Sequence, residues 1–251
     1  TDKRLFPLLK RTLGEKNIRY VHKKDNIDET EYDFHIAMGS LPKYLRPSLE
    51  SFHNAKQLIL QVDENKSNQI RHQLLDNRYK KIIGISWKSE STTIKNKSLS
   101  LETFILGIYS PNIKFVCLQY GQVKEEIQNI KAKYGIEIYE MEDIDKFNDI
   151  DSLAALIQAC DDVVSIGNVT VPLAGSIGCN CKVLMVKNNA WWWGNDDKNS
   201  YWYPSLKLFK QKEFDEWEQP LNLIKDELKV IVPTTTTKEQ SISSSQKNLI
   251  K

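Results

Sequence analysis

Residues 165–178, SIGNVTVPLAGSIG, join two apolar stretches through a turn whose residue types suit an anion. A helix that begins directly after a strand offers backbone N–H groups and the positive end of its dipole to a negative ligand. Gly167 permits a tight turn, and Asn168 and Thr170 can cap the helix or donate to phosphate oxygens. Pro172 has no N–H, but the first turn of a helix does not use that group. The turn therefore predicts either a phosphate-binding site or an ordinary strand-to-helix corner.

A lysine follows a second apolar stretch, in the loop WKSES, which contains Lys88 and Ser89. The lysine ammonium is a compact cation suited to a diphosphate, and a solvated surface lysine is the alternative interpretation. Gln119 and Tyr120 end a third stretch, where they could contact a ligand or only shape the turn. If the three stretches are neighbouring strands, these residues gather at one edge of a sheet.

Other reactive residue types give weaker signals. Asp149 and Asp151, in FNDID, could reach a ribose or a base, although Asp151 is better placed to cap a helix. The four histidines lie outside the predicted sheet and no pair has the spacing of metal ligands, so no metal or other cofactor is expected. The tryptophans at 191–193, with Trp202 and Tyr203, could stack on a sugar or base or simply cover the sheet edge.

The residues between 81 and 187 alternate between strand and helix patterns. Runs rich in β-branched residues predict strands over 81–87, 113–121, 136–140, 162–167 and 181–187. Helical apolar spacing predicts helices over 100–109, 123–135, 151–160 and 171–178. Gly135 and Gly178 stand where a glycine commonly ends a helix. Such alternation predicts an α/β fold, a doubly wound parallel sheet with right-handed crossovers.

In a sheet of this kind the expected strand order is 3-2-1-4-5, which reverses between the first and fourth strands. Ligands bind at the carboxyl ends of the strands beside such a reversal. The loops concerned are WKSES, after the first strand, and GNVTVP, after the fourth. Lys88 and the turn at 167–172 are therefore predicted to face one crevice.

Residues 1–76 predict a small, partial α/β unit. Helices are expected over 4–14 and 65–77, and strands over 17–22 and 32–39. Two strands leave sheet edges unpaired, so we expect this unit to be the end of a larger domain.

The carboxyl-terminal part is less regular. Residues 190–211 are rich in aromatic side chains and predict irregular structure, and a closing helix is expected over 219–229. The tail, 233–251, has almost no apolar residues and predicts disorder.

Length and composition are ordinary for a globular protein. The chain has 251 residues, enough for one large or two small domains, with 40% hydrophobic and 27% charged residues. Its 35 basic and 33 acidic residues give a net charge of +2, which argues against recruitment of nucleic acid or an anionic membrane. The four cysteines form no disulfide pattern, and no apolar run reaches about 18 residues. A cytoplasmic protein without a membrane span is expected.

The chain resembles the carboxyl-terminal, glycosyltransferase-like region of bacterial tetratricopeptide-repeat proteins, which is related to the O-GlcNAc transferases and heptosyltransferases. The resemblance runs from residue 1 to about 230. It is carried, in this order, by RLFPLLKR, MGSLPKYLR, GISWKS, KSLSLE, LQYG, FNDIDSLAALI, SIGNVTVPLAGSIG and WYPSLKLFKQ.

The resemblance implies a GT-B enzyme, whose second, Rossmann-like domain binds a nucleotide-diphosphate sugar and whose first domain binds a protein or glycan acceptor. By this resemblance residues 1–76 are the end of a truncated acceptor domain and 77–232 the nucleotide-sugar-binding domain, before the tail at 233–251. The implied donor and diphosphate contacts are Lys88, Ser89, Gln119, Tyr120, Asp149, Asn168, Val169 and Thr170.

The implied activity is sugar transfer of the hexosyltransferase type, without nucleic acid, and with tetratricopeptide repeats as a further partner upstream in the same chain. No catalytic base is assigned. Proteins of this kind commonly have histidine where this chain has Pro172, so an imidazole that could contact phosphate or sugar is missing. The alternative, from another functional class, is a catalytically degenerate nucleotide-binding or scaffold module that keeps the fold.

Overall fold

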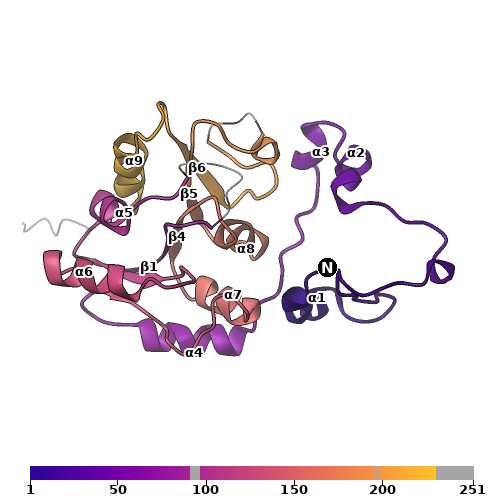
Figure 1. Cartoon of the computed structure of the whole chain (residues 1–251), viewed down its shortest axis with the longest axis horizontal. Helices are drawn as coiled ribbons and strands as arrows, with labels where there is room; N and C mark the ends of the chain where they lie inside the picture. Colours follow the sequence, from indigo (N-terminus) through magenta and orange to yellow (C-terminus); the bar gives the residue numbers. More distant parts are fainter. Residues whose placement is uncertain (91–96, 195, 197, 230–251) are drawn as a thin grey trace, which may run out of the picture.

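The computed structural model describes residues 1–90, 97–194, 196 and 198–229. Its centre is a six-stranded parallel sheet with the order β3-β2-β1-β4-β5-β6 (Figure 1). The strands are β1 (Lys81–Ser86), β2 (Ile113–Cys117), β3 (Ile138–Tyr139), β4 (Asp162–Ile166), β5 (Cys181–Met185) and β6 (Leu206–Lys210). The predicted Rossmann-like α/β class and the order of the first five strands are confirmed. The tail at 233–251, predicted to be disordered, lies outside the described residues.

The sixth strand corrects the prediction of irregular structure over 190–211. β6 pairs in parallel with β5, from Cys181↔Leu206 to Met185↔Lys210. Leu206 and Leu208 are buried whereas Lys207 is exposed, the alternation of a strand at the edge of a sheet.

Helices cover both faces of the sheet (Figure 1). On one face lie α5 (Leu101–Ile108), α6 (Lys124–Tyr134) and α9 (Glu218–Leu228), and on the other α4 (Glu64–Leu74), α7 (Ile150–Gln158) and α8 (Thr170–Ser176). Phe104 and Phe115 are buried in the first layer, and Leu74 and Leu156 in the second. A sheet that is covered twice has strands that are apolar on both sides. None of the described helices has the length and apolar character that crossing a bilayer requires.

Local signals set the ends of the helices. The side chains of Asp63, Ser100 and Asp149 accept hydrogen bonds from N–H groups in the first turns of α4, α5 and α7. The predicted cap at Asp151 is therefore wrong, and this carboxylate instead forms a bidentate pair with Arg11 (2.8 and 2.7 Å). The glycine that ends α6, at 135, has a φ of 67°, a left-handed conformation that favours glycine.

The amino-terminal segment has no strand among its described residues. A 3₁₀ turn at Lys3–Leu5 and α1 (Phe6–Leu13) confirm the helix predicted over 4–14, whereas the strands predicted over 17–22 and 32–39 do not form. A strand needs the backbone groups of a neighbouring edge, and in the described part of the chain the sheet ends at β3 and β6.

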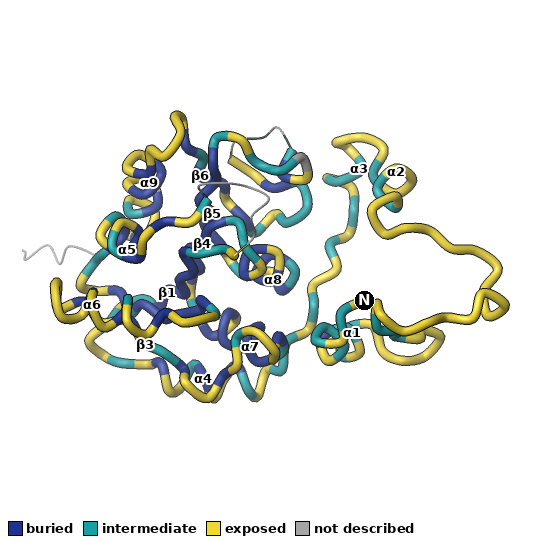
Figure 2. The backbone as a smooth tube through the Cα atoms, viewed as in Figure 1, coloured by how far each residue is buried: buried dark blue, intermediate teal, exposed yellow. Residues whose placement is uncertain are grey.

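The chain makes a long, mostly exposed excursion before it enters the sheet domain (Figure 2). It contains the short helices α2 (Leu41–Leu45) and α3 (Glu50–His53). Phe34, Met38 and Tyr44 are 92%, 82% and 66% exposed there. Large apolar side chains that are exposed to this extent can serve as contacts for further protein.

The helix α1 packs on the layer of α7 and α8. Leu8 is fully buried in the cluster that contains both helices, and the Arg11–Asp151 pair joins α1 to α7. Farther along, the N–H of Leu60 donates to the carbonyl of Ser176 at the end of α8 (2.8 Å). The amino-terminal segment is thus held beside the helix whose first turn contains the predicted site.

Candidate functional site

One glutamine ties together the carboxyl ends of β1 and β2. The Oε1 atom of Gln119 accepts hydrogen bonds from Ser86 Oγ (2.9 Å) and from the N–H groups of Trp87 (3.1 Å) and Lys88 (2.9 Å). Its Nε2 donates to the carbonyl of Tyr120 (3.2 Å), and the residue is 3% exposed. Both polar atoms of the side chain are engaged within the protein, so Gln119 holds the WKSES loop in place.

Asn168 extends this arrangement to the end of β4. Its Oδ1 accepts from the N–H of Thr170 (3.0 Å) and from Ser165 Oγ (3.2 Å). Its Nδ2 donates to Ser86 Oγ (2.6 Å) and to the carbonyl of Lys88 (3.0 Å). We call the bonds of Gln119 and Asn168 the strand-end network. The network joins the loops after β1 and β4, and the two loops are neighbours as the strand order predicts.

The first turn of α8 uses most of its own donors. The N–H of Thr170 goes to the Asn168 side chain, that of Val171 goes to the Asn168 carbonyl (3.3 Å), and Pro172 has none. Thr170 is only 1% exposed, whereas Val169 is 46% exposed. Of the three predicted residues in this turn, Val169 is the most exposed, Asn168 is partly buried with both polar atoms of its side chain bonded within the protein, and Thr170 is closed off.

The Lys88 side chain is engaged by α6 rather than by the turn after β4. Its Nζ pairs with Glu126, and the same carboxylate accepts from the indole N–H of Trp87 (3.2 Å). The Lys88 side chain remains 41% exposed. The backbone of Lys88 thus lies at the predicted crevice, but its ammonium lies against α6. In the same loop, the N–H of Ser89 donates to Ser98 Oγ (3.0 Å).

The remaining two predicted residues lie toward α7. The ring of Tyr120 packs on that of Phe147, with centroids 5.5 Å apart. Asp149 accepts from the N–H of Ser152 (2.9 Å), and Lys66 Nζ lies 3.8 Å from its carboxylate. Asp149 therefore does not join the strand-end network.

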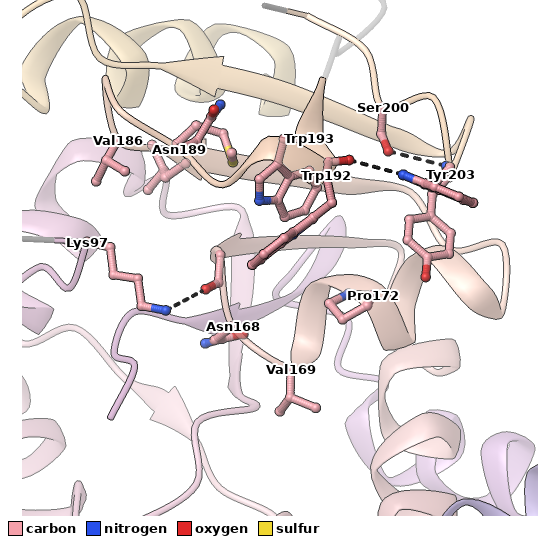
Figure 3. A pocket seen from close by; sticks show the side chains of 14 residues that line it. Lys97, Asn168, Val169, Pro172, Val186, Asn189, Trp192, Trp193, Ser200 and Tyr203 are labelled. Carbon is pink, nitrogen blue, oxygen red and sulfur yellow. Dashed lines mark hydrogen bonds between the residues drawn. The ribbon is translucent and has the colours of Figure 1, made fainter. Parts of the chain in front are cut away.

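A cavity of about 460 Å³ opens beside the turn after β4 (Figure 3). Its walls come from the turn itself, from the end of β5 and the residues that follow it, and from the aromatic segment at 192–203. We call it the switch-point cavity, because it adjoins the turn after β4, one of the two strands between which the strand order reverses. Lys88 and Ser89, in the loop after β1, are not among its lining residues. Its volume is within the range of small-molecule sites.

Lys97 brings a positive charge to this cavity. It is the one charged side chain among the described residues that line the cavity, and its Nζ donates to the carbonyl of Gly167 (3.2 Å) (Figure 3). Burial lowers the pKa of the Lys97 ammonium from its ordinary value. Lys97 begins the KSLSLE motif of the resemblance but was not predicted to contact a ligand, because only the fold brings it to the turn after β4.

Aromatic side chains form another wall of the cavity. Trp192, Trp193 and Tyr203, which are labelled in Figure 3, line it together with Trp202. The indole N–H of Trp202 donates to the carbonyl of Trp192 (3.0 Å). Tyr203 packs so closely on α8 that a Cβ at Gly175 would lie 2.5 Å from its ring. These four aromatics line the cavity, and whether they stack on a sugar or base or only cover the sheet edge stays a prediction.

A smaller cavity of about 270 Å³ lies on the other side of the same turn, between α1 and α8. Leu5, Leu9 and Leu173 contribute to its apolar lining. Val169 and Pro172 line both cavities. Position 172, where the resemblance expects histidine, is thus part of the partition between the two cavities.

The groups that the switch-point cavity presents are an ammonium, amides, two hydroxyls, aromatic rings and apolar side chains without rings or with a saturated ring. Among the described residues, no group of three or more histidine, cysteine, aspartate or glutamate side chains is arranged to hold a metal ion. Burial raises the pKa of the Cys117 thiol, at the end of β2, to about 11, so this thiol is a poor nucleophile at neutral pH.

A curated protein is similar to most of the chain. No protein-family model matches the chain. The protein FlbA of Caulobacter vibrioides is 29% identical over 239 residues, which make up 89% of this chain and 39% of that protein. The chain therefore spans about two fifths of the length of the curated relative that it matches.

Solved structures show the type of fold. The ADP-heptose LPS heptosyltransferase II of E. coli matches with a TM-score of 0.51 at 12% identity, over 74% of this chain and 57% of that one. A family 9 glycosyl transferase of Veillonella parvula matches with a TM-score of 0.45 at 15% identity, over 71% of this chain and 54% of that one. At such identities the likeness concerns the fold alone. The first match shows a Rossmann-like fold of the GT-B glycosyltransferase type.

Proposed function

We propose that this chain is the donor-binding part of a GT-B glycosyltransferase, which holds a nucleotide-diphosphate sugar in the switch-point cavity and transfers the sugar to an acceptor. The position and lining of the cavity carry the proposal. The cavity adjoins the turn after β4, one of the two strands between which the strand order reverses, and it combines an aromatic wall with Lys97. Aromatic rings suit a base or sugar ring, and an ammonium suits a diphosphate.

In the proposed reaction, lysines stabilise the charge on the leaving group. The acceptor nucleophile bonds to the anomeric carbon of the sugar while the bond from that carbon to the diphosphate oxygen breaks, and its electron pair leaves with the diphosphate. Lys97 already lies at the turn after β4. Lys88 reaches the diphosphate by exchanging its Glu126 partner for the ligand. The base that takes the acceptor proton is left unassigned.

Five of the eight predicted residues have a role in this proposal, and Tyr120, Asp149 and Thr170 have none. Lys88 and Val169 contact the donor, and Ser89 borders it from the WKSES loop. Gln119 and Asn168 are positioning residues, because the strand-end network already uses their polar atoms. They keep the two loops at the distance that one diphosphate can bridge.

The rest of the chain is proposed to serve the acceptor. Residues 1–76 belong to an acceptor domain and 77–232 to the donor domain. The exposed apolar side chains of Phe34, Met38 and Tyr44 support this division, since they fit a surface that further protein covers. The proposed acceptor is a protein or glycan, with tetratricopeptide repeats of the same polypeptide as a further partner.

Calorimetric titration with adenosine, guanosine and uridine diphosphates is expected to show binding of at least one of them. The adenosine nucleotide is included because the heptosyltransferase with a similar fold is named for ADP-heptose. Lys97→Ala and Lys88→Ala are each expected to weaken this binding by roughly 10- to 100-fold, since a hydrogen bond to a charged group contributes about 1.5–3 kcal/mol.

Lys131→Ala is the matched control for both variants. Lys131 is also ion-paired, with Glu137 (2.9 Å), but it lies in the last turn of α6, away from the cavity lining. The proposal is wrong if no diphosphate binds, or if Lys97→Ala behaves like Lys131→Ala. Binding without turnover of any sugar nucleotide would instead support the alternative, a degenerate nucleotide-binding module, which Pro172 favours.

Removal of divalent metal ions is expected to leave nucleotide binding unchanged. In the proposal Lys88 and Lys97 neutralise the diphosphate, a task that Mg²⁺ performs in many other nucleotide sites. The measurement is the same titration after dialysis against EDTA, repeated with added Mg²⁺. A loss of affinity in EDTA that Mg²⁺ restores would contradict this part of the proposal.

A further inference from the structure

A short stretch of the amino-terminal segment contacts the aromatic wall of the switch-point cavity. The ring of Phe52, on α3, lies edge-on to Trp202, with centroids 4.8 Å apart and an interplanar angle of 87°. Its centroid is also 6.0 Å from that of Tyr201, and the Arg46 guanidinium lies 6.0 Å from it. Segments far apart in the sequence therefore meet at the rim of the cavity.

The contact continues from Phe52 into the cavity. Trp202 lines the cavity, and its indole N–H donates to the carbonyl of Trp192, which also lines it (3.0 Å). Tyr201 packs over Gly194, where a Cβ would lie 2.3 Å from the ring. Phe52 thus packs on two neighbouring aromatic side chains, Tyr201 and Trp202, and the second of these lines the cavity.

The wall has little regular structure of its own in the described part of the chain. It begins with a 3₁₀ turn, η4 (Trp191–Trp193), and rejoins the sheet near the bridge between Asn199 and Lys207. A segment of this kind keeps its path through side-chain packing rather than through a backbone ladder. An edge-to-face ring pair stabilises such packing beyond the effect of area burial.

We propose that Phe52 is a positioning residue for the switch-point cavity: it holds Trp202, and through it the Trp192 carbonyl, in the arrangement that receives the ligand. The identity of that ligand rests on the proposed function. Phe52 is not among the described residues that line the cavity, so it acts through Trp202. Ligand binding and the docking of α3 on Trp202 are then linked equilibria. If docked α3 raises the affinity for the ligand, the bound ligand stabilises docked α3 by the same factor.

The first test measures affinity in Phe52→Ala, Phe52→Tyr and Tyr44→Ala. Phe52→Ala is expected to weaken binding of whichever nucleoside diphosphate the wild type binds by about two- to tenfold, the contribution of one aromatic pair. Phe52→Tyr, which keeps the ring, is expected to bind like the wild type. Tyr44→Ala is the control, because Tyr44 is an aromatic of the same segment and is 66% exposed.

Tryptophan fluorescence gives a second readout that needs no nucleotide. Acrylamide is expected to quench Phe52→Ala more strongly than the wild type, because the Trp202 indole loses the ring that covers it. Tyr44→Ala is expected to be quenched like the wild type. Far-UV circular dichroism checks that each variant is folded, and Phe52→Leu replaces Phe52→Ala if the latter does not fold.

Equal quenching and equal affinity in a folded Phe52 variant would overturn the inference. Stronger quenching with unchanged affinity would overturn it as well, because the wall would then move without consequence for the ligand. If the wild type binds none of the three diphosphates, the proposed function fails. Quenching then decides the inference alone: a stronger effect in Phe52→Ala supports Phe52 as the residue that holds the wall, and an equal effect overturns that role.

Discussion

Gln119→Ala is expected to lower the free energy of unfolding by about 2–4 kcal/mol and to weaken nucleotide binding at least tenfold. The substitution removes the oxygen that accepts three hydrogen bonds, in a place that is 3% exposed. The N–H groups of Trp87 and Lys88 lose their partner, and each buried N–H left unpaired costs about 1–3 kcal/mol. The WKSES loop then no longer holds Lys88 beside the turn after β4. Urea unfolding followed by circular dichroism measures the first effect, and calorimetry the second.

Two further variants test this explanation. Gln219→Ala removes an exposed glutamine of α9 and should change stability by no more than about 0.5 kcal/mol. Gln119→Glu keeps an oxygen acceptor but loses the amide that donates to Tyr120, so its effect should lie between those of the two alanine variants. If Gln119→Ala proves as stable as Gln219→Ala, the strand-end network does not support the site.

Asp162 lies at the amino-terminal end of β4, the end away from the cavity. Asp162→Ala is expected to lower the free energy of unfolding by about 3–5 kcal/mol. The Asp162 carboxylate, at the start of β4, accepts from Lys182 Nζ (2.7 Å) and Lys81 Nζ (3.0 Å). The side chains of Lys182 and Asp162 are 9% and 10% exposed. Without the carboxylate, two ammonium groups face each other with little water around them, which costs more than the loss of the pairs alone. Urea unfolding measures this change.

Lys182→Met separates the cost of leaving a buried charge unpaired from the cost of losing one ion pair. It removes one cation, keeps the Lys81–Asp162 pair and leaves an unbranched apolar chain in the buried place, so we expect a cost below about 1.5 kcal/mol. Equal losses in the two variants would contradict the explanation. Because Asp162 begins β4 and the cavity lies at the other end of that strand, folded Asp162→Ala should bind nucleotide like the wild type.

Most of the sheet could be predicted from the sequence, because strands buried on both faces are apolar runs that stand out between helical patterns. The two edge strands were harder to predict for one shared reason. β3 pairs over Ile138–Tyr139 alone, less than the predicted 136–140, and β6 alternates lysine with apolar residues after a segment dominated by aromatics. An edge strand buries fewer of its side chains, so its run of apolar residues is shorter or interrupted by polar ones.

The strands predicted over 17–22 and 32–39 failed for a different reason. A strand-like composition indicates side chains that fit a pleated, half-buried surface, and it does not supply the neighbouring strand. In the described structure these residues have no such neighbour and stay irregular. Propensity alone therefore could not decide their structure.

At the site, the sequence placed the loops correctly but could not assign their side chains. Asn168 and Gln119 have the polarity of ligand-binding residues, yet their partners lie within the protein. The Lys88–Glu126 pair and the approach of Lys97 to Gly167 join residues that no local pattern links. Such roles depend on which helix or loop faces which strand end, and that is decided by tertiary packing.

Position 172 shows how such a protein can change during evolution. Pro172 is exposed in the first turn of α8, where its missing N–H takes nothing from the helix, and it stands between two cavities. The fold therefore constrains this residue little, whereas its side chain contributes to the walls of both cavities. Under the proposed function, selection can change the lining of the donor site at this one codon without passing through an unstable intermediate.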